Sequence, residues 1–206
     1  MQTKLKSAAR AHSLKIRAFV GIWLSEPLRE RAEALQQNLM QHCPAQAVKW
    51  VERQNLHFTL KFLGEVKMEA VLALEQACRR AASMTAFNIT VAGLGAFPSL
   101  WRPETIWVGI EEGKEQLAAL AARLEEEVAE HGFAKSARPF SPHLTLGRVR
   151  DGRYSKDLGL ALQKAGNPIL GCQPVSSFTL IESRLTPQGP IYTPLADISL
   201  CTVPLL

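Results

Sequence analysis

Two short stretches of the chain alternate apolar and polar residues and contain the same four-residue pattern. They are residues 56–60 (LHFTL) and 142–146 (PHLTL), and each includes His-x-Thr-Leu. Alternation with a period of two predicts a half-buried β-strand, in which successive side chains point to opposite faces. The pattern therefore predicts a duplicated strand, with one copy in each half of the sequence.

Strand parity decides which side chains of each stretch lie together. In the first stretch we expect His57, Thr59 and Lys61 on one face, opposite four apolar residues, Leu56, Phe58, Leu60 and Phe62. In the second stretch His143 and Thr145 share a face, opposite Leu144 and Leu146. A lone strand histidine is usually structural, but two copies with the same parity favour a pair that acts on a shared substrate.

The remaining apolar pattern alternates helices with strands. Apolar residues at helical spacing predict four helices, over about residues 26–39, 67–82, 114–131 and 154–165. Runs rich in β-branched and aromatic residues predict strands at 16–24, 48–51, 87–91, 105–110, 175–183 and 192–203, besides the histidine strands at about 56–63 and 143–149. Residues 93–98 (GLGAFP) predict a turn or irregular loop, because Pro98 and Pro103 disfavour the helix that a phosphate-binding glycine motif needs.

These elements predict a mixed α+β fold, because amphipathic helices must bury their apolar faces against sheets. We expect two pseudo-symmetric lobes, each an antiparallel sheet with packed helices, around a central cleft that holds both histidines. Residues 16–206 are expected to form one bilobal domain. Residues 1–15, which are basic and contain no acid, are expected to form a flexible tail.

Composition restricts the class of protein. With 206 residues, 47% of them apolar, the chain is long enough to bury a core. No apolar run reaches the roughly 18 residues that span a bilayer, and the first fifteen residues lack the apolar segment of a secretory signal. The four cysteines have no zinc or disulfide spacing: Cys43, Cys78, Cys172 and Cys201. We expect a cytoplasmic monomer with reduced thiols and without cofactor, metal or membrane partner.

The formal charge of +5 comes from the N-terminal tail. Five basic residues precede the first acid, and the other 19 basic residues balance the 19 acids. Residues 135–156 nevertheless carry six bases against one acid, and they contain the second histidine motif. This segment either attracts phosphate through a local positive potential or forms a solvated basic face.

The side chains of the paired motif suit phosphodiester cleavage. Imidazole has an unperturbed pKa of roughly 6.5, so one histidine can accept a proton from a nucleophile while the other donates one to the leaving oxygen. A threonine two residues later lies on the same face and can donate to a non-bridging phosphate oxygen. Together the four side chains supply acid, base and charge stabilisation.

Other kinds of catalytic site have less support in the sequence. A metal site would need a third ligand, and no Asp, Glu, Cys or His lies two positions from either motif histidine. A GxSxG nucleophile elbow does not occur. His12, His42 and His131 lack any partner pattern and are expected to face solvent.

The residues resemble those of the 2H phosphoesterases, a superfamily with two HxT motifs, and within it the RNA 2′,3′-cyclic phosphodiesterases, also called 2′-5′ RNA ligases. The resemblance extends over about residues 17–203. The blocks that carry it are, in order, RAFVGI (17–22), NLHFTLKFLG (55–64), GLGAFP (93–98), RPFSPHLTLGR (138–148) and ESRL (182–185).

The resemblance implies a metal-independent enzyme that opens a 2′,3′-cyclic phosphate end of RNA to a 2′-phosphate. It implies that His57 is the proton donor to the leaving 3′ oxygen and that His143 is the base that activates water. Thr59 and Thr145 would hold the phosphate oxygens. Similar proteins also join 2′-5′ linkages in the reverse direction, which the same two groups permit.

Two further residues and two other functions stay open. Arg148 is a candidate phosphate contact, although strict parity puts it opposite His143 unless the strand bends near Gly147. Tyr192 follows a proline-bounded turn and either stacks on a base or packs in the core. A nucleotide- or RNA-binding module without turnover would share these motifs, as would a phosphoesterase acting on small cyclic nucleotides or on ADP-ribose cyclic phosphate.

Overall fold

The computed structural model describes residues 14–201 and confirms the α+β class. In chain order the elements are β1 (Lys15–Trp23), α1 (Glu26–Met40), β2 (Val48–Trp50), β3 (His57–Lys67), α2 (Val71–Ala81), β4 (Phe87–Ser99), β5 (Arg102–Ile110), α3 (Lys114–Ala129), β6 (Leu144–Val149), α4 (Ser155–Ala165), β7 (Ile169–Val175), β8 (Ser177–Leu185) and β9 (Pro190–Ser199). β1 begins at Lys15, which was expected in the tail. The rest of that expected tail, residues 1–13, lies outside the described residues.

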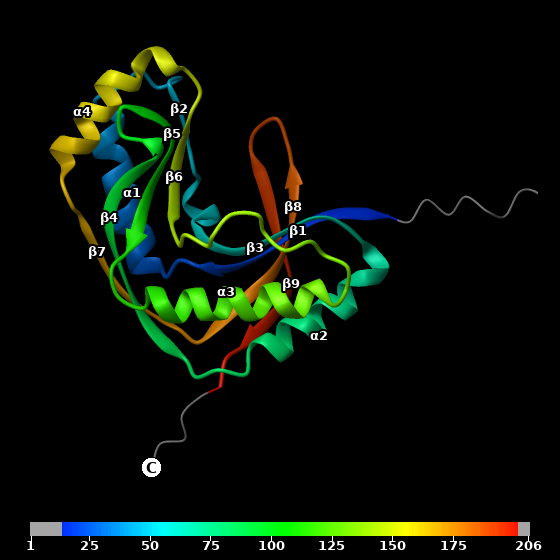
Figure 1. Ribbon diagram of the computed structural model, residues 1–206. Coiled ribbons are helices and arrows are strands. Elements are labelled where there is room, and N and C mark those ends of the chain that lie inside the picture. The colour runs from blue at the N-terminus through cyan, green and yellow to red at the C-terminus, as the bar shows by residue number, and fades with distance from the viewer. Residues whose placement is uncertain (1–13, 202–206) are drawn as a thin grey trace, which may run out of the picture.

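The strands form one nine-stranded sheet in the order β7-β4-β5-β6-β3-β1-β8-β9, with β2 added beside β6. Its two halves, β7 to β6 and β3 to β9, meet where Phe58 of β3 lies opposite Leu144 of β6 in antiparallel pairing. Figure 1 shows the halves turned away from each other at this junction. The expected two-lobed arrangement is confirmed, with the addition that both lobes share a continuous sheet.

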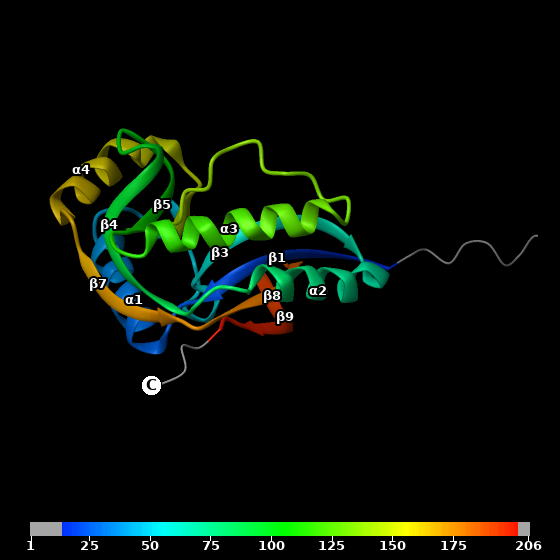
Figure 2. The ribbon, with the colours of Figure 1, turned by 60° about the horizontal axis from the view of Figure 1, so that its bottom comes forward.

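Each half of the sheet carries two helices. α2 and α3 lie side by side, with α3 against β3 and α2 against β9 (Figure 2). α1 and α4 contact the other half at β7 and β5. The predicted apolar stripe of α3 is fully buried: Leu117, Leu120, Leu124 and Val128. No helix within residues 14–201 has the length and apolar character needed to cross a bilayer.

Three strand predictions are wrong, each because of glycine or proline. β3 continues past Gly64, which takes a left-handed φ of 72° without ending the pairing with β1. β4 includes residues 93–98, expected as a loop, because a register shift and a φ of 84° at Gly93 accommodate the glycines within the strand. β7 was not predicted, since Gly171 and Pro174 interrupt its pattern. As an edge strand it tolerates both.

A β-bulge in β3 changes the parity expected for the first histidine strand. The β1 partners of Thr59 and Lys61 are consecutive residues, so Leu60 is an extra residue on β3. Leu60 and Lys61 therefore both point inward, with 3% and 4% exposure, and Phe62 turns outward with 67% exposure. The predictions that Lys61 shares the face of His57 and that Phe62 packs in the apolar face are both wrong.

The second histidine strand has a bulge at the equivalent residue. The β5 partners of Thr145 and Gly147 are consecutive, so Leu146 is the extra residue on β6. The Leu146 carbonyl accepts a hydrogen bond from Nε2 of the buried Gln36 on α1, at 2.8 Å. After the bulge, the Arg148 side chain lies on the same face of β6 as Thr145. The bulge supplies the bend near Gly147 without which strict strand parity would put Arg148 on the opposite face.

Candidate active site

The pairing of β3 with β6 brings the two histidine motifs together. Phe58 and Leu144 lie opposite each other in antiparallel strands, and each is the next residue after a motif histidine. His57, His143 and both motif threonines line one cleft of about 1110 Å³ between the lobes. Two imidazoles that are far apart in sequence therefore face the same space.

His57 is oriented by its own strand and by the turn before it. Its Nδ1 lies 2.6 Å from the Asn55 carbonyl oxygen, and its Nε2 lies 3.1 Å from Oγ1 of Thr59. A carbonyl oxygen only accepts hydrogen bonds, so Nδ1 carries a proton. Nε2 is then the atom that gains or loses a proton, next to the threonine hydroxyl.

His143 repeats this arrangement in the other lobe. Its Nδ1 lies 2.8 Å from the Ser141 carbonyl oxygen, which also belongs to the residue two positions before the histidine. Nδ1 is again the donor, and Nε2 is again the atom left for proton exchange. The two half-sites are thus related in hydrogen bonding as well as in sequence.

Asn55 fixes the carbonyl that orients His57. It is buried, and its Nδ2 donates to Oε2 of Glu52 at 3.1 Å and to the carbonyl oxygen of Pro190 at 3.0 Å. Pro190 begins β9, the strand that carries Tyr192. One buried amide therefore connects the orientation of His57 with the position of Tyr192.

Aromatic rings enclose His57. Phe19 packs 4.8 Å from the imidazole, Tyr192 meets it edge-on at 5.2 Å, and Trp23 lies 6.0 Å away, all measured between ring centroids. Tyr192 is half-buried, and burial raises the pKa of its phenol. Tyr192 thus packs against His57 and lines the cleft at the same time.

A smaller aromatic group supports His143. Phe97 meets the imidazole edge-on at 5.1 Å, and Trp107 lies 6.4 Å away. Trp107 occupies the space left by Gly95, where an added Cβ would be 2.4 Å from the indole ring. The glycine-rich segment of β4 therefore makes room for the ring that supports His143.

Burial lowers the pKa of both imidazoles below its ordinary value. Hydrogen bonds to the Asn55 and Ser141 carbonyls oppose this effect, because they favour the protonated rings. The positive charge of Arg148 lowers the pKa of both histidines further, and His143 has the same effect on His57. The free protein therefore favours neutral imidazoles, and a phosphate anion in the cleft would shift both toward their charged forms.

Lys61 connects β3 to the segment that leads to His143. Its side chain is 2% exposed and forms an ion pair with Glu125 of α3 at 2.6 Å. Its Nζ also donates to the Ala134 carbonyl at 2.8 Å and to Oγ of Ser136 at 3.3 Å, and Glu125 accepts from the Ser136 amide at 3.1 Å. The strand that carries His57 thus holds the approach to His143.

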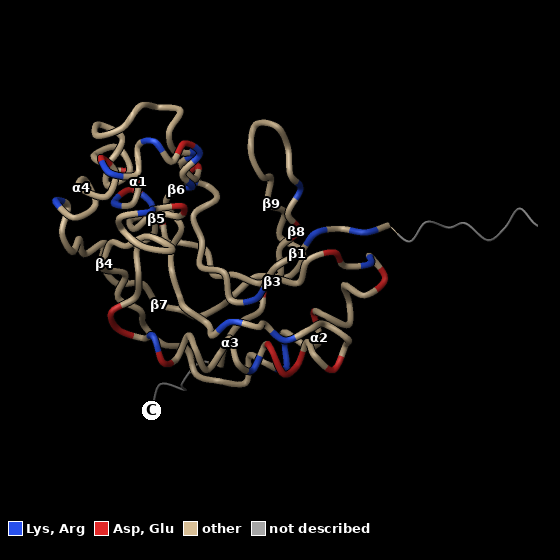
Figure 3. The backbone as a smooth tube through the Cα atoms, turned by 45° about the horizontal axis from the view of Figure 1, so that its top comes forward, with Lys and Arg blue, Asp and Glu red and all other residues tan. Residues whose placement is uncertain are grey.

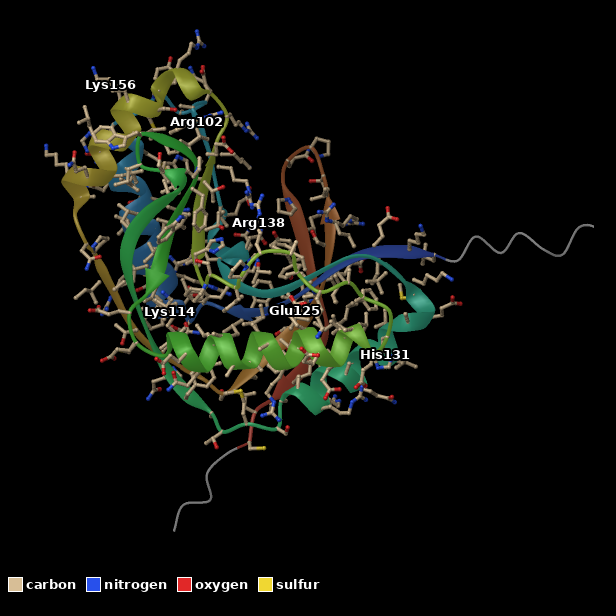
Figure 4. All side chains as sticks on the ribbon, in the orientation of Figure 1. Arg102, Lys114, Glu125, His131, Arg138 and Lys156 are labelled. Atoms are coloured by element: carbon tan, nitrogen blue, oxygen red, sulfur yellow. The ribbon has the colours of Figure 1, made fainter. Side chains whose placement is uncertain are left out.

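Three arginines border the cleft on different elements. Arg17 lies on β1, Arg148 on β6, and Arg138 on the segment between α3 and β6. Figure 3 shows basic positions on β1, on β3 and on that segment, and Figure 4 labels Arg138 above Glu125 of α3. Within residues 14–201 no carboxylate is at ion-pair distance from any of the three arginines. Their positive charge suits an anionic ligand.

The other candidate features of the sequence lie outside the cleft. His42 and His131 are exposed, as expected, while His12 lies outside the described residues. Across residues 14–201, no cluster of three or more His, Cys, Asp or Glu side chains is placed to hold a metal ion.

The structure brings all six predicted site residues to one cleft: His57, Thr59, His143, Thr145, Arg148 and Tyr192. Their roles stay predictions. Sequence reasoning missed the supporting aromatic rings and the Lys61–Glu125 pair, which come from elements distant in sequence. It also missed the two carbonyl partners, although both lie two residues before a motif histidine.

A comparison with known protein families agrees with the duplicated histidine motif. The sequence profile of a family described as LigT like Phosphoesterase matches the chain twice, at residues 22–107 and 108–192. Each match contains one histidine motif. The repeat that is visible in the two strands therefore extends over almost the whole of each half of the sequence.

Individual relatives cover nearly the whole chain. The RNA 2′,3′-cyclic phosphodiesterase of Methanothermobacter thermautotrophicus is 37% identical over 181 residues, which are 87% of this chain and 96% of the relative. TT0787 of Thermus thermophilus is similar in structure, with a TM-score of 0.75, 28% identity, and coverage of 90% of this chain and 98% of that one. Escherichia coli LigT complexed with 3′-AMP gives a TM-score of 0.73 at 30% identity, with 91% and 99% coverage. The chain belongs to the LigT-like phosphoesterase family.

Proposed function

We propose that this protein hydrolyses the 2′,3′-cyclic phosphate at the end of an RNA to a 2′-phosphate, using its two histidines as general acid and general base. The observation that carries the proposal is the shared cleft, in which each histidine has Nδ1 bound to a carbonyl and Nε2 available. The relative from Methanothermobacter thermautotrophicus is named for this activity.

The reaction breaks one P–O bond and consumes one water. Nε2 of His143 takes a proton from water as its oxygen attacks phosphorus, and the P–O3′ bond breaks as Nε2 of His57 gives a proton to O3′. The product has a 2′-phosphomonoester and a free 3′ hydroxyl. His143 ends protonated and His57 neutral, so exchange of protons with solvent restores the starting state.

Neighbouring donors would stabilise the charge that develops on the phosphate. Thr59, whose hydroxyl is 3.1 Å from Nε2 of His57, and Thr145 are placed to donate to the non-bridging oxygens. Arg148 adds a positive charge on the same face of β6. If a 5′ hydroxyl takes the place of the water, the same proton transfers would open the cyclic phosphate, form a 2′-5′ linkage and release the 3′ hydroxyl, so ligation of 2′-5′ linkages needs no further catalytic group.

The test uses an oligonucleotide that ends in a 2′,3′-cyclic phosphate, incubated in EDTA and in water enriched in ¹⁸O. We expect a 2′-phosphate product that contains one ¹⁸O, detected by mass spectrometry, and a bell-shaped dependence of kcat/KM on pH. His57→Asn and His143→Asn should each reduce kcat by at least about 100-fold.

His131→Asn, an exposed histidine outside the cleft, is the matched control and should retain full activity. Full turnover by either cleft variant would contradict the acid–base mechanism. Tight binding of the oligonucleotide without any product would identify a nucleotide-binding module instead. Turnover confined to small cyclic nucleotides would identify a phosphoesterase of a different substrate class.

We also propose that the protein acts as a cytoplasmic monomer. Both half-sites come from one chain, so the cleft is complete without a second copy. The four cysteines are unpaired, which fits a reducing compartment. Light scattering of the purified protein at several concentrations tests the monomer, and a mass that rises with concentration would contradict it.

A further inference from the structure

Gln36 is a buried side chain of α1 that is bonded to the bulge in β6. It is 3% exposed, and its Nε2 donates to the carbonyl oxygens of Val51 at 2.9 Å and of Leu146 at 2.8 Å. Leu146 is the extra residue of the bulge, and Val51 directly follows β2, the strand that pairs with β6. The Val51 amide also donates to the Leu146 carbonyl, at 2.9 Å. One amide group therefore ties the bulge to the end of the neighbouring strand.

Gln36 interrupts an otherwise apolar buried face. The other buried residues of α1 are Leu28, Ala32 and Leu39, so packing alone would favour an apolar side chain at this position. A buried amide is tolerated only where it is hydrogen-bonded, because an unpaired one loses its interactions with water. The contacts that distinguish glutamine from an apolar residue here are its bonds to the two carbonyls.

The bulge decides which face Arg148 occupies. On β6 this residue lies opposite Lys49 of β2 on one side and Thr105 of β5 on the other, and its Nη1 donates to Oγ1 of Thr105 at 3.3 Å. Without the extra residue, strand parity would turn Arg148 away from the face of Thr145. Gln36 does not line the cleft, but it bonds the backbone that directs this guanidinium into it.

The other motif strand is held in a related way. Lys61, the residue after the bulge in β3, is bonded to Glu125 of α3. α1 and β3 belong to the first matched half of the sequence, and α3 and β6 belong to the second. Each bulged strand is thus bonded to a polar side chain on the helix of the other half.

We propose that Gln36 is a positioning residue, which holds the bulge at Leu146 and thereby keeps Arg148 facing the cleft. Its influence on the substrate passes through Arg148. The inference rests on the proposed function for the substrate that Arg148 contacts, whereas the orientation of Arg148 needs no substrate. A weaker bulge lowers the fraction of molecules with the guanidinium in the cleft, and the apparent affinity falls with that fraction.

The test is a double-mutant cycle between Gln36→Met and Arg148→Gln, with an oligonucleotide that ends in a 2′,3′-cyclic phosphate. Methionine keeps the length of the side chain and removes the amide. Gln36→Met should raise KM roughly 5-fold, as for loss of buried hydrogen bonds, with a smaller effect on kcat. In the Arg148→Gln background the same substitution should leave KM nearly unchanged, because no guanidinium remains to be positioned.

Gln173→Met is the matched control for the loss of a buried amide. Gln173 is 4% exposed, donates to the Trp23 carbonyl at 3.0 Å, accepts from the Ser25 amide at 2.8 Å, and bonds neither bulge. Its removal should cost stability, while any change in KM should add to that of Arg148→Gln. If Gln36→Met does not fold, Gln36→Asn replaces it in the cycle with the same expected coupling, because its amide is shorter by one methylene group.

A measurement on the free protein separates this proposal from the proposed function. NMR titration should give higher pKa values for His57 and His143 in Gln36→Met than in the wild type, because the Arg148 charge that lowers both has moved away. Absence of turnover by the wild type would contradict the proposed function alone, and the titration would then decide the role of Gln36. Additive changes in KM, or unchanged histidine pKa values in Gln36→Met, would overturn that role.

Discussion

Arg148 affects both histidines from one position on β6. Its charge adds to the effect of burial and lowers the pKa of His57 and of His143. It also lines the cleft, where a phosphate would be attracted to it. The Arg148 charge therefore adds to burial in favouring neutral imidazoles, and we expect it to attract an anion that would shift both histidines toward their charged forms.

Removing this charge should produce two effects with different readouts. Arg148→Gln is expected to raise KM for the cyclic phosphate about 10-fold, as for loss of a charged hydrogen bond. The pH optimum of kcat/KM should move upward, because both histidine pKa values rise without the neighbouring cation. Rate–pH profiles measure both. Arg150→Gln is the control, because Arg150 is exposed and lies outside the cleft. If the pH optimum of Arg148→Gln did not move, Arg148 would contribute to substrate binding alone and not to the histidine pKa values.

At the scale of elements, β3 determines the position of both half-sites. It carries His57 and Thr59 and, after the bulge, turns Lys61 inward to the segment before β6. The resulting ion pair with Glu125 is protected from solvent on the lysine side, where exposure is 2%. Breaking one partner of such a pair costs more than removing both, because a charge is left without its counterion.

Lys61→Met should lower the free energy of unfolding by about 3 kcal/mol. This is at the lower end of the cost of breaking a buried ion pair, because the Glu125 side chain keeps some contact with water. It should also lower kcat, because the segment that positions His143 loses its anchor. Urea unfolding and steady-state kinetics give the two values. The double variant Lys61→Met/Glu125→Gln should recover part of the stability, and full stability of the single variant would contradict the anchor.

β4 supports His143 through a glycine. Gly95→Ala would place a Cβ 2.4 Å from the ring of Trp107, which packs 5.0 Å from Phe97 and 6.4 Å from His143. We expect a loss of about 1–3 kcal/mol of stability from overpacking, together with a lower kcat. Gly152→Ala, whose nearest neighbour would be 3.8 Å away, is the control. Unfolding curves and kcat for both variants test this, and an unaffected Gly95→Ala would show that the indole has room to move.

At the scale of the whole molecule, the sequence predicted the helices and the two histidine strands well. The apolar residues of α3 recur at the spacing of a helical turn. The residues around each motif histidine alternate between apolar and polar, as in a half-buried strand. The bulges after Thr59 and Thr145 were not predictable, because pairing with β1 and β5 creates them and these partners are distant in sequence. The faces of Lys61 and Phe62 were therefore assigned wrongly, while the histidines, which precede the bulges, were placed on the cleft face.

The two half-buried motif histidines also connect stability with pH. Their folded pKa values lie below the unfolded value of about 6.5, so the folded protein binds fewer protons than the unfolded chain. Stability is complete above that pH and falls as pH decreases through it toward the folded pKa values. Urea unfolding at pH 8, 6.5 and 5 measures the decline.

A double variant assigns that decline to the two imidazoles. His57→Gln/His143→Gln should flatten the pH dependence between 6.5 and 5, because neither side chain then titrates in that range. His42→Gln/His131→Gln alters two exposed histidines and should keep the wild-type slope. An equal slope in both double variants would attribute the decline to other groups.

The junction at Phe58 and Leu144 also bears on how a ligand is oriented in the cleft. The two half-sites are related to each other across it, and each imidazole is hydrogen-bonded to the backbone carbonyl of the residue two positions before it. Rotated by half a turn, such a site would exchange its two histidines, so its symmetry does not decide which of them faces which oxygen of a ligand. The unequal flanks must then set the orientation of the ligand, with Phe62 and Tyr192 beside one half and Arg148 beside the other. Changes in these flanks can therefore exchange the positions of the two histidines relative to the ligand without altering either one.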